Sequence, residues 1–304
     1  MTRLLDASLF LLLAVLWGLS FPAISVGLDY LPPILFAAFR YDTAAILLLG
    51  YAAVRSDDWW PRGRNNLAAI AGGGLFLVAG NGLLFVGQQT VPSGVASIIQ
   101  GLVPIFTALW ALALLGERLS GVGAAGVAVG FLGIGFVVQP DPNNLLAGDT
   151  LARLIIVGQV ASVALGGVLV QRAGPDLERV SLTGWSMLVG ALVLHAVSLW
   201  LGEIPGTEAT APAAIGAIVY LGVFSTAIAF VIYFTILEEN GAFEAALVAY
   251  LVPVVATLVG VLVLGESISG LAIVGFGLVA LGFALLKRRA IATMVGSSTV
   301  SSRS

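Results

Sequence analysis

Ten long apolar runs, separated by short polar or proline-containing breaks, occupy most of this 304-residue sequence. A helix needs about 20 predominantly apolar residues to cross the hydrocarbon core of a bilayer, and each run has roughly that length. The breaks leave no room for a soluble domain. The pattern therefore predicts an all-α membrane protein with ten transmembrane helices, over residues 8–28, 34–54, 67–88, 93–115, 120–138, 149–170, 181–201, 213–236, 242–264 and 269–286.

The composition agrees with a chain whose surface faces lipid. Hydrophobic residues make up 59% of it and charged residues only 10%, whereas a soluble domain carries about a quarter charged residues. The chain has no cysteine and one histidine, which argues against disulfides, thiolate metal sites and a histidine metal centre. We expect no cofactor and no metal. Without clustered acids or histidines near one interface, we expect no enzyme, and no nucleotide-binding Gly-x-x-x-x-Gly-Lys run is present.

The basic residues predict the orientation. If the N-terminus is cytoplasmic and the loops alternate, eleven of the thirteen basic residues lie on the cytoplasmic side, which is the positive-inside pattern. They are Arg3, Arg55, Arg62, Arg64, Arg118, Arg172, Arg179, Lys287, Arg288, Arg289 and Arg303. An even number of spans then puts both termini in the cytoplasm. The first run is interpreted as a retained helix, and residues 290–304 as a disordered cytoplasmic tail.

An internal repeat divides the chain into two halves. Gly116-Glu117-Arg118-Leu119-Ser120-Gly121 reappears as Gly265-Glu266-Ser267-Ile268-Ser269-Gly270, 149 residues later, and the same offset carries Leu102-Val103-Pro104 onto Leu251-Val252-Pro253. We predict five helices in residues 1–140 and five in 141–289. Because five is odd, the second half enters the membrane from the opposite side. Such inverted repeats are typical of alternating-access transporters with a site near the midplane.

These residues resemble the EamA-like family of the drug/metabolite transporters. The resemblance spans residues 8–288 and rests on Trp17-Gly18 with Phe21-Pro22, on Arg40, and on the doubled Pro…Gly-Glu element at Pro104 and Pro253. It implies ten helices, both termini inside, an inner-membrane location in a prokaryote, and export or exchange of amino acids, metabolites or drugs. It also implies a cavity lined by helices 1, 3, 4, 6, 8 and 9. The second half departs from the pattern, because Trp17 aligns with Gly166 and Arg40 with Val189.

Few polar side chains lie within the apolar runs, and each needs a partner or an aqueous cavity there. The candidates for lining a substrate cavity are Asn81, Gln88, Gln100, Gln159, Tyr233 and Tyr250. The alternative is that they only form hydrogen bonds between helices. Trp17 and Phe21 are candidates for an aromatic wall against an apolar or cationic solute, or for ordinary packing.

Three prolines interrupt the predicted spans. Pro22, Pro104 and Pro253 each remove one backbone hydrogen bond, so we interpret them as hinges or as sites of freed carbonyls, although proline kinks are also ordinary in membrane helices. Glu117 and Glu266 are expected to accept hydrogen bonds from the start of the following helix. Gly126 and Gly130 form a small-residue face, for packing within the bundle or for a dimer.

The charged residues inside the spans are candidates for coupling. Arg40 either extends to the surface or anchors a negative group, and Asp42 is two residues away, so the two face different directions. Asp42 and Glu244 are the possible proton carriers, while facilitated diffusion or exchange remains open. His195 has apolar neighbours in sequence and is expected to be packed and neutral.

The leading hypothesis is a secondary transporter that exports small organic metabolites by alternating access. Its amide and aromatic candidates favour zwitterionic or uncharged solutes, such as amino acids. The alternatives are a channel and a non-transporting scaffold. Expected partners are the solute and lipid, without nucleic acid, and a monomer is favoured over a dimer.

Overall fold

All regular elements of the described chain are helices. A computed structural model describes residues 3–140, 148–239 and 242–288, leaving aside the side chains of residues 3–7 and 242–247. Within these ranges eight helical segments are long and apolar enough to cross a bilayer, and two shorter apolar helices, Val248–Leu264 and Gly270–Leu286, complete a set of ten. The predicted all-helical membrane protein is confirmed. The prediction for the tail, 290–304, lies outside the described residues.

The first five spans contain several breaks. In chain order the elements are α1 (Arg3–Gly18) with α2 (Ser20–Leu28); α3 (Pro33–Arg55); α4 (Gly63–Gly72), η1 (Gly73–Val78), η2 (Ala79–Asn81) and α5 (Gly82–Gly87); α6 (Ser93–Gln100) with α7 (Val103–Leu114); and α8 (Gly121–Val138). The first, third and fourth spans are therefore discontinuous. Discontinuous spans are where transporters commonly expose backbone and polar groups to a solute.

The second five spans are more regular. They are α9 (Gly148–Ala173); α10 (Arg179–Leu201); α11 (Pro212–Val219), η4 (Tyr220–Ile228) and α12 (Ala229–Glu239), preceded by the short turn η3 (Thr207–Thr210); α13 (Ala242–Leu264); and α14 (Gly270–Leu286). Only the eighth span changes helix type along its length.

The repeated Gly-Glu motif has a structural explanation. Gly116 and Gly265 both adopt the left-handed conformation, with φ of 71° and 68°, which glycine adopts without the steric cost of a Cβ atom. Ser120 and Ser269 then cap α8 and α14, because their side chains accept hydrogen bonds from the backbone N–H of the third residue of each helix. The motif therefore ends one span and begins the next.

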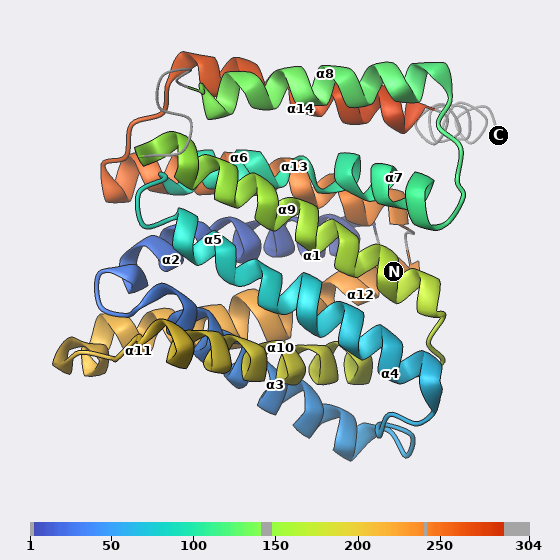
Figure 1. The fold of residues 1–304 in the computed structure, drawn as a ribbon, viewed down its shortest axis with the longest axis vertical. Helices are drawn as coiled ribbons and strands as arrows, with labels where there is room; N and C mark the ends of the chain where they lie inside the picture. Colours follow the sequence, from blue (N-terminus) through green and yellow to red (C-terminus); the bar gives the residue numbers. More distant parts are fainter. Residues whose placement is uncertain (1–2, 141–147, 240–241, 289–304) are drawn as a thin grey trace.

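The helices form layers (Figure 1). α8 and α14 run side by side at one edge, α6, α7, α9 and α13 lie next to them, and α3, α10 and α11 form the opposite edge. Contacts between the halves come in related pairs: α10 packs on η1 as α3 packs on η4, and α7 packs on α9 as α13 packs on α1.

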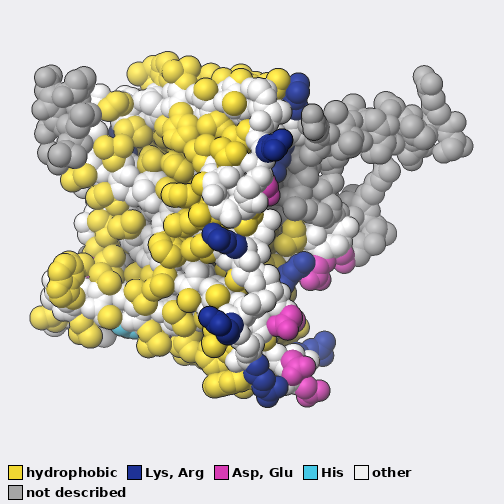
Figure 2. All heavy atoms as spheres, turned by 45° about the vertical axis from the view of Figure 1, so that its right-hand side comes forward, with side chains coloured by type: hydrophobic (Ala, Val, Ile, Leu, Met, Phe, Trp, Pro, Cys, Tyr) yellow, Lys and Arg dark blue, Asp and Glu magenta, His cyan; other side chains and the backbone are white. Residues whose placement is uncertain are grey.

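Lys and Arg side chains gather at one end of the helices (Figure 2), which we call the basic end. The opposite end, with Asp29, Glu203 and Glu266, is called the far end.

Two wide-turn segments also follow the 149-residue offset. η1 and η4 are π-helices within the third and eighth spans, and Gly73 of η1 corresponds to Gly222 of η4. A π-turn leaves the regular α-helical hydrogen-bond pattern and is frequent at functional sites. η1 contacts α9 and α10, whereas η4 contacts α3. Both irregular segments therefore face the other half of the chain.

The glycines of α8 pack directly against α14 within the chain. A Cβ atom on Gly126 would lie 2.5 Å from the carbonyl oxygen of Gly282, and one on Gly133 would lie 2.7 Å from that of Gly275. Gly130 instead meets Ile105 of α7. The small-residue face is thus filled inside the bundle, where the absence of side chains lets two backbones approach closely.

This seam gives a matched pair of substitutions. Gly133→Ala is expected to destabilise the protein by about 1–3 kcal/mol, because its methyl group would overlap the α14 backbone. Gly135→Ala, two residues along the same helix, meets open space and should be neutral or slightly stabilising through helix propensity. Thermal unfolding of both variants in detergent checks this, and equal midpoints would show that the seam tolerates a methyl group.

Candidate substrate site

Four polar side chains from four spans form one continuous chain of hydrogen bonds. Gln100 Nε2 donates to Gln159 Oε1 at 2.6 Å, Gln159 Nε2 donates to Asn81 Oδ1 at 2.7 Å, and Asn81 Nδ2 donates to the Tyr41 hydroxyl at 2.5 Å. Gln159 is 1% exposed and Tyr41 is also buried. We call this set the amide chain. It joins α3, η2, α6 and α9.

The amide chain lies where helices break. Asn81 ends η2, and Gln100 ends α6 directly before the turn at Gly101 and Leu102. Three of the predicted cavity residues therefore meet, although they come from different spans. Tyr41 was missed, because a tyrosine beside Arg40 gives no sequence signal that separates it from a packed aromatic residue.

A second cluster is aromatic and joins the first and eighth spans. The ring centroid of Trp17 lies 5.5 Å from that of Tyr233 and 6.1 Å from that of Phe230. By the repeat offset, Phe230 corresponds to Asn81. The position that carries an amide in the first half thus carries an aromatic ring in the second, so the two related positions differ in chemistry.

Three other predicted cavity residues lie elsewhere. Gln88 is buried and donates to the Phe21 carbonyl at 3.1 Å, so it braces the third span against the first. Tyr250 packs on Phe283 of α14, at 4.9 Å between ring centroids, and its buried hydroxyl has no hydrogen-bond partner among the described residues. None of these three residues, Gln88, Phe21 and Tyr250, belongs to the amide chain.

The prolines lie near helix breaks in two of three cases. The first span breaks at Leu19, three residues before Pro22, and the fourth breaks at Gly101 and Leu102, before Pro104. This agrees with the loss of a backbone donor at each proline. Pro253, by contrast, lies inside continuous α13. The hinge role of the three prolines remains a prediction.

Asp42 and His195 form a pair that the sequence did not suggest. His195 Nε2 lies 2.6 Å from Asp42 Oδ2, with both side chains about one-third exposed, and Phe39 packs on the imidazole. The prediction of a packed histidine is wrong, because the side chain of His195 is about one-third exposed and pairs with Asp42; α3 and α10 pack along their lengths and bring these residues together. The coupling role of Asp42 is still a prediction, and the side chain of Glu244 lies outside the described residues.

The far end carries a groove of about 600 Å³, lined in part by Ser25, Asp29, Gln88 and Glu266. Glu266 accepts from the backbone N–H of Ser93 at 3.0 Å and from the Ser93 hydroxyl at 2.7 Å. The expected partner of Glu266, the start of the following helix, is therefore wrong: it caps α6, a helix of the other half. This contact, which we call the far-end latch, fastens the ninth span to the fourth.

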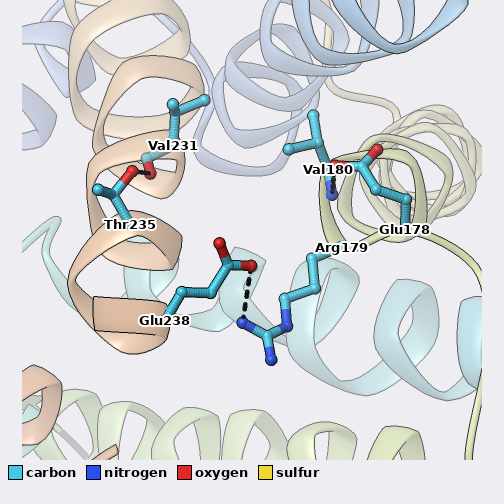
Figure 3. A network of polar contacts seen from close by, with 6 residues as sticks. All are labelled: Glu178, Arg179, Val180, Val231, Thr235 and Glu238. Carbon is cyan, nitrogen blue, oxygen red and sulfur yellow. Dashed lines mark hydrogen bonds and ion pairs between the residues drawn. The ribbon is translucent and has the colours of Figure 1, made fainter. Parts of the chain in front are cut away.

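The basic end carries a more exposed contact. Arg179 at the start of α10 pairs with Glu238 of α12 at 3.1 Å, while Glu178 accepts from the Val180 N–H and Thr235 bonds the Val231 carbonyl within its own helix (Figure 3). Exposed pairs of this kind contribute only about 0–1 kcal/mol. We assign this contact to the stability of the helix ends.

Comparison with known proteins agrees with a transport fold. The sequence model of the EamA-like transporter family matches the chain twice, over residues 5–139 and 150–288. The uncharacterized inner membrane transporter YedA of Escherichia coli K12 is 31% identical over 278 residues, covering 90% of this chain and 88% of that protein. A probable amino-acid metabolite efflux pump of the same organism is 27% identical over 303 residues, covering 94% and 97%.

A solved structure supports the fold alone. That crystal structure matches with a TM-score of 0.64 and 19% identity, covering 95% of this chain and 99% of its own. The family match spans nearly the whole chain in two copies, and the relatives carry transporter names. The protein is therefore a multi-pass membrane protein that belongs to the EamA-like transporter family.

Proposed function

We propose that this chain is a secondary transporter that moves small organic metabolites across the cytoplasmic membrane by alternating access. The observation that carries the proposal is the amide chain, a hydrogen-bonded polar set inside the bundle, with Gln159 and Tyr41 buried and with Asn81 and Gln100 half-buried at the breaks of the third and fourth spans. Polar groups inside a membrane protein are costly and mark solute or ion pathways. Amide hydrogen bonds between spans are worth about 0.6–2 kcal/mol each, which is small enough to rearrange during a transport cycle.

The topology proposed from the sequence has further support. The halves, 1–140 and 141–289, are proposed to be inverted, with both termini in the cytoplasm. The family match in two copies, the paired contacts between halves and the basic side chains at one end (Figure 2) support this arrangement. The basic end is then cytoplasmic and the far end external.

The amide chain and the aromatic cluster together favour an amphipathic solute. The amide chain offers amides and a phenol, and the aromatic cluster offers Trp17, Phe230 and Tyr233. This combination suits an amino acid or similar zwitterion with an apolar side chain. The relative named as an amino-acid metabolite efflux pump supports the same class, and we propose export as the direction.

A flux assay tests the proposal against the channel and scaffold alternatives. Purified protein in liposomes preloaded with unlabelled L-leucine, L-phenylalanine or L-threonine is expected to take up the corresponding labelled amino acid with saturation and counterflow. Flux that rises linearly with concentration, without counterflow, would indicate a channel. No flux above that of empty liposomes for the whole amino-acid panel would contradict the proposal.

A further inference from the structure

Arg40 is a buried cation without a counter-ion in the described part of the chain. It is 7% exposed. Its Nε donates to the Thr226 hydroxyl at 2.9 Å, and that hydroxyl donates to the Leu221 carbonyl at 2.6 Å. Among the described residues no carboxylate lies within ion-pair distance of Arg40, because Asp42 pairs with His195 instead. Four of its five N–H donors make no hydrogen bond within these residues.

This arrangement is unfavourable unless an anion completes it. A guanidinium stays charged at any physiological pH, and a buried charge without a partner is strongly destabilising. Arg153 differs at its terminal nitrogens: Nη1 donates at 3.1 Å to the carbonyls of Val137 and Val138, at the C-terminus of α8, where negative partial charge gathers, although its buried Nε has no partner among the described residues.

Arg40 also lies at the junction of the two halves, next to the amide chain. Its helix, α3, packs on η4 of the eighth span. Gly222 of η4 permits this approach, because a Cβ atom there would lie 2.5 Å from Thr43 Cβ and 3.1 Å from the Arg40 carbonyl. The guanidinium carbon is 5.3 Å from the ring centroid of Tyr41, the last member of the amide chain.

We propose that Arg40 binds the carboxylate of the transported solute and that Thr226 positions its guanidinium for this contact. The inference rests on the proposed transport function. With Nε held by Thr226, the two terminal nitrogens form a fork that matches a carboxylate in two parallel hydrogen bonds. The residue that corresponds to Arg40 in the second half is Val189, so the described site supplies one guanidinium, which suits a single carboxylate better than a phosphate with two negative charges.

The first test uses the wild-type protein. In the liposome assay, the carboxylate and carboxamide of one amino acid are compared as inhibitors of counterflow, for example L-leucine against L-leucinamide. We expect the carboxylate to inhibit about ten- to a hundredfold more strongly, the ratio that corresponds to one charge-assisted hydrogen-bonded contact. Equal inhibition by both compounds, with saturable transport intact, would overturn the Arg40 proposal but leave the transport function standing. Absence of all flux would overturn the transport function instead.

The second test assigns the preference to Arg40. Arg40→Gln is expected to raise the KM for L-leucine about ten- to a hundredfold and to bring the carboxylate-to-carboxamide ratio close to one, and Arg40→Lys is expected to give an intermediate ratio because it keeps charge but loses the fork. Thr226→Val should lower the ratio as well. Arg153→Gln, which removes a cation bound elsewhere, should leave the ratio unchanged. A wild-type ratio in folded Arg40→Gln would overturn the proposal. If Arg40→Gln does not fold, the carboxylate-to-carboxamide ratio in Arg40→Lys decides instead, and a wild-type ratio in that variant would overturn the proposal.

Discussion

A Gln159→Leu variant is expected to lose transport by at least about a hundredfold and to unfold at a lower temperature than the wild type. Gln159 is the middle of the amide chain, and it both accepts from Gln100 and donates to Asn81. Leucine has a similar size but no polar atom, so Gln100 Nε2 and Asn81 Oδ1 would each lose a partner. An unsatisfied buried polar group costs about 1–3 kcal/mol. Asn81 and Gln100 are only half-buried, so we expect a destabilisation of about 1–3 kcal/mol for the two lost hydrogen bonds together.

The transport loss has a separate cause. The amide chain links the second, third, fourth and sixth spans through side chains, so removing its centre separates the groups proposed to face the solute. Gln171→Leu is the matched control, because Gln171 is an exposed residue of the same helix, α9. Counterflow in liposomes at equal protein density, with thermal unfolding in detergent, checks both effects. Wild-type transport in Gln159→Leu would exclude the amide chain from the solute pathway.

The sequence predicted the members of the amide chain but not their connection. Asn81, Gln100 and Gln159 stood out because uncharged polar residues are rare within the spans. Their meeting depends on the packing of α9 against α5, α6, α7 and η1, and hydrophobic periodicity alone does not determine which spans become neighbours. Tyr41 shows a second limit of sequence-based prediction. A tyrosine can pack as an aromatic ring or form a hydrogen bond through its hydroxyl, and the sequence does not distinguish these two roles.

The internal repeat predicted more of the structure than the composition did. The 149-residue offset placed Gly116 with Gly265, and both end a span with positive φ. It did not reveal that η1 and η4 are π-helices, since a wide turn depends on what packs against it as well as on local sequence. The Asp42–His195 pair was missed for a similar reason: the two residues are 153 positions apart, and each looked isolated in its own span.

The far-end latch connects the repeat to alternating access. Glu266 follows the ninth span and caps the fourth, and its own N–H bonds the Gly260 carbonyl at 2.9 Å. The offset makes Glu117 its counterpart, and the Glu117 N–H bonds the Ala111 carbonyl, at the position that corresponds to Gly260. The same offset relates Ser93 to Ala242 at the start of α13. An inverted pair of latches would fasten opposite ends of the fourth and ninth spans in opposite conformations.

Glu266→Ala is therefore expected to open the far end. The variant removes two charge-assisted hydrogen bonds between the halves, each worth about 1.5–3 kcal/mol, so the ratio of open to closed far-end conformers should rise about a hundredfold or more. The chain has no cysteine, so spin labels can be attached at Thr90→Cys and Ser267→Cys, two exposed positions beside the latch. Pulsed electron–electron double resonance should show a longer distance between the two spin labels in Glu266→Ala than in the protein with Glu266.

Glu203→Ala is the control that separates opening from simple loss of a cap. Glu203 also accepts two hydrogen bonds at the far end, from the backbone N–H groups of Ile34 at 3.2 Å and Leu35 at 2.8 Å. It joins α10 to α3, however, and these helices pack along their lengths, so its loss should lower stability without lengthening the Thr90–Ser267 distance. If both variants lengthen that distance equally, the effect is general loosening of the far end. A distance unchanged in Glu266→Ala would show that the Ser93 contact does not hold the closed conformer, because removing a restraint between two separable halves must change their populations.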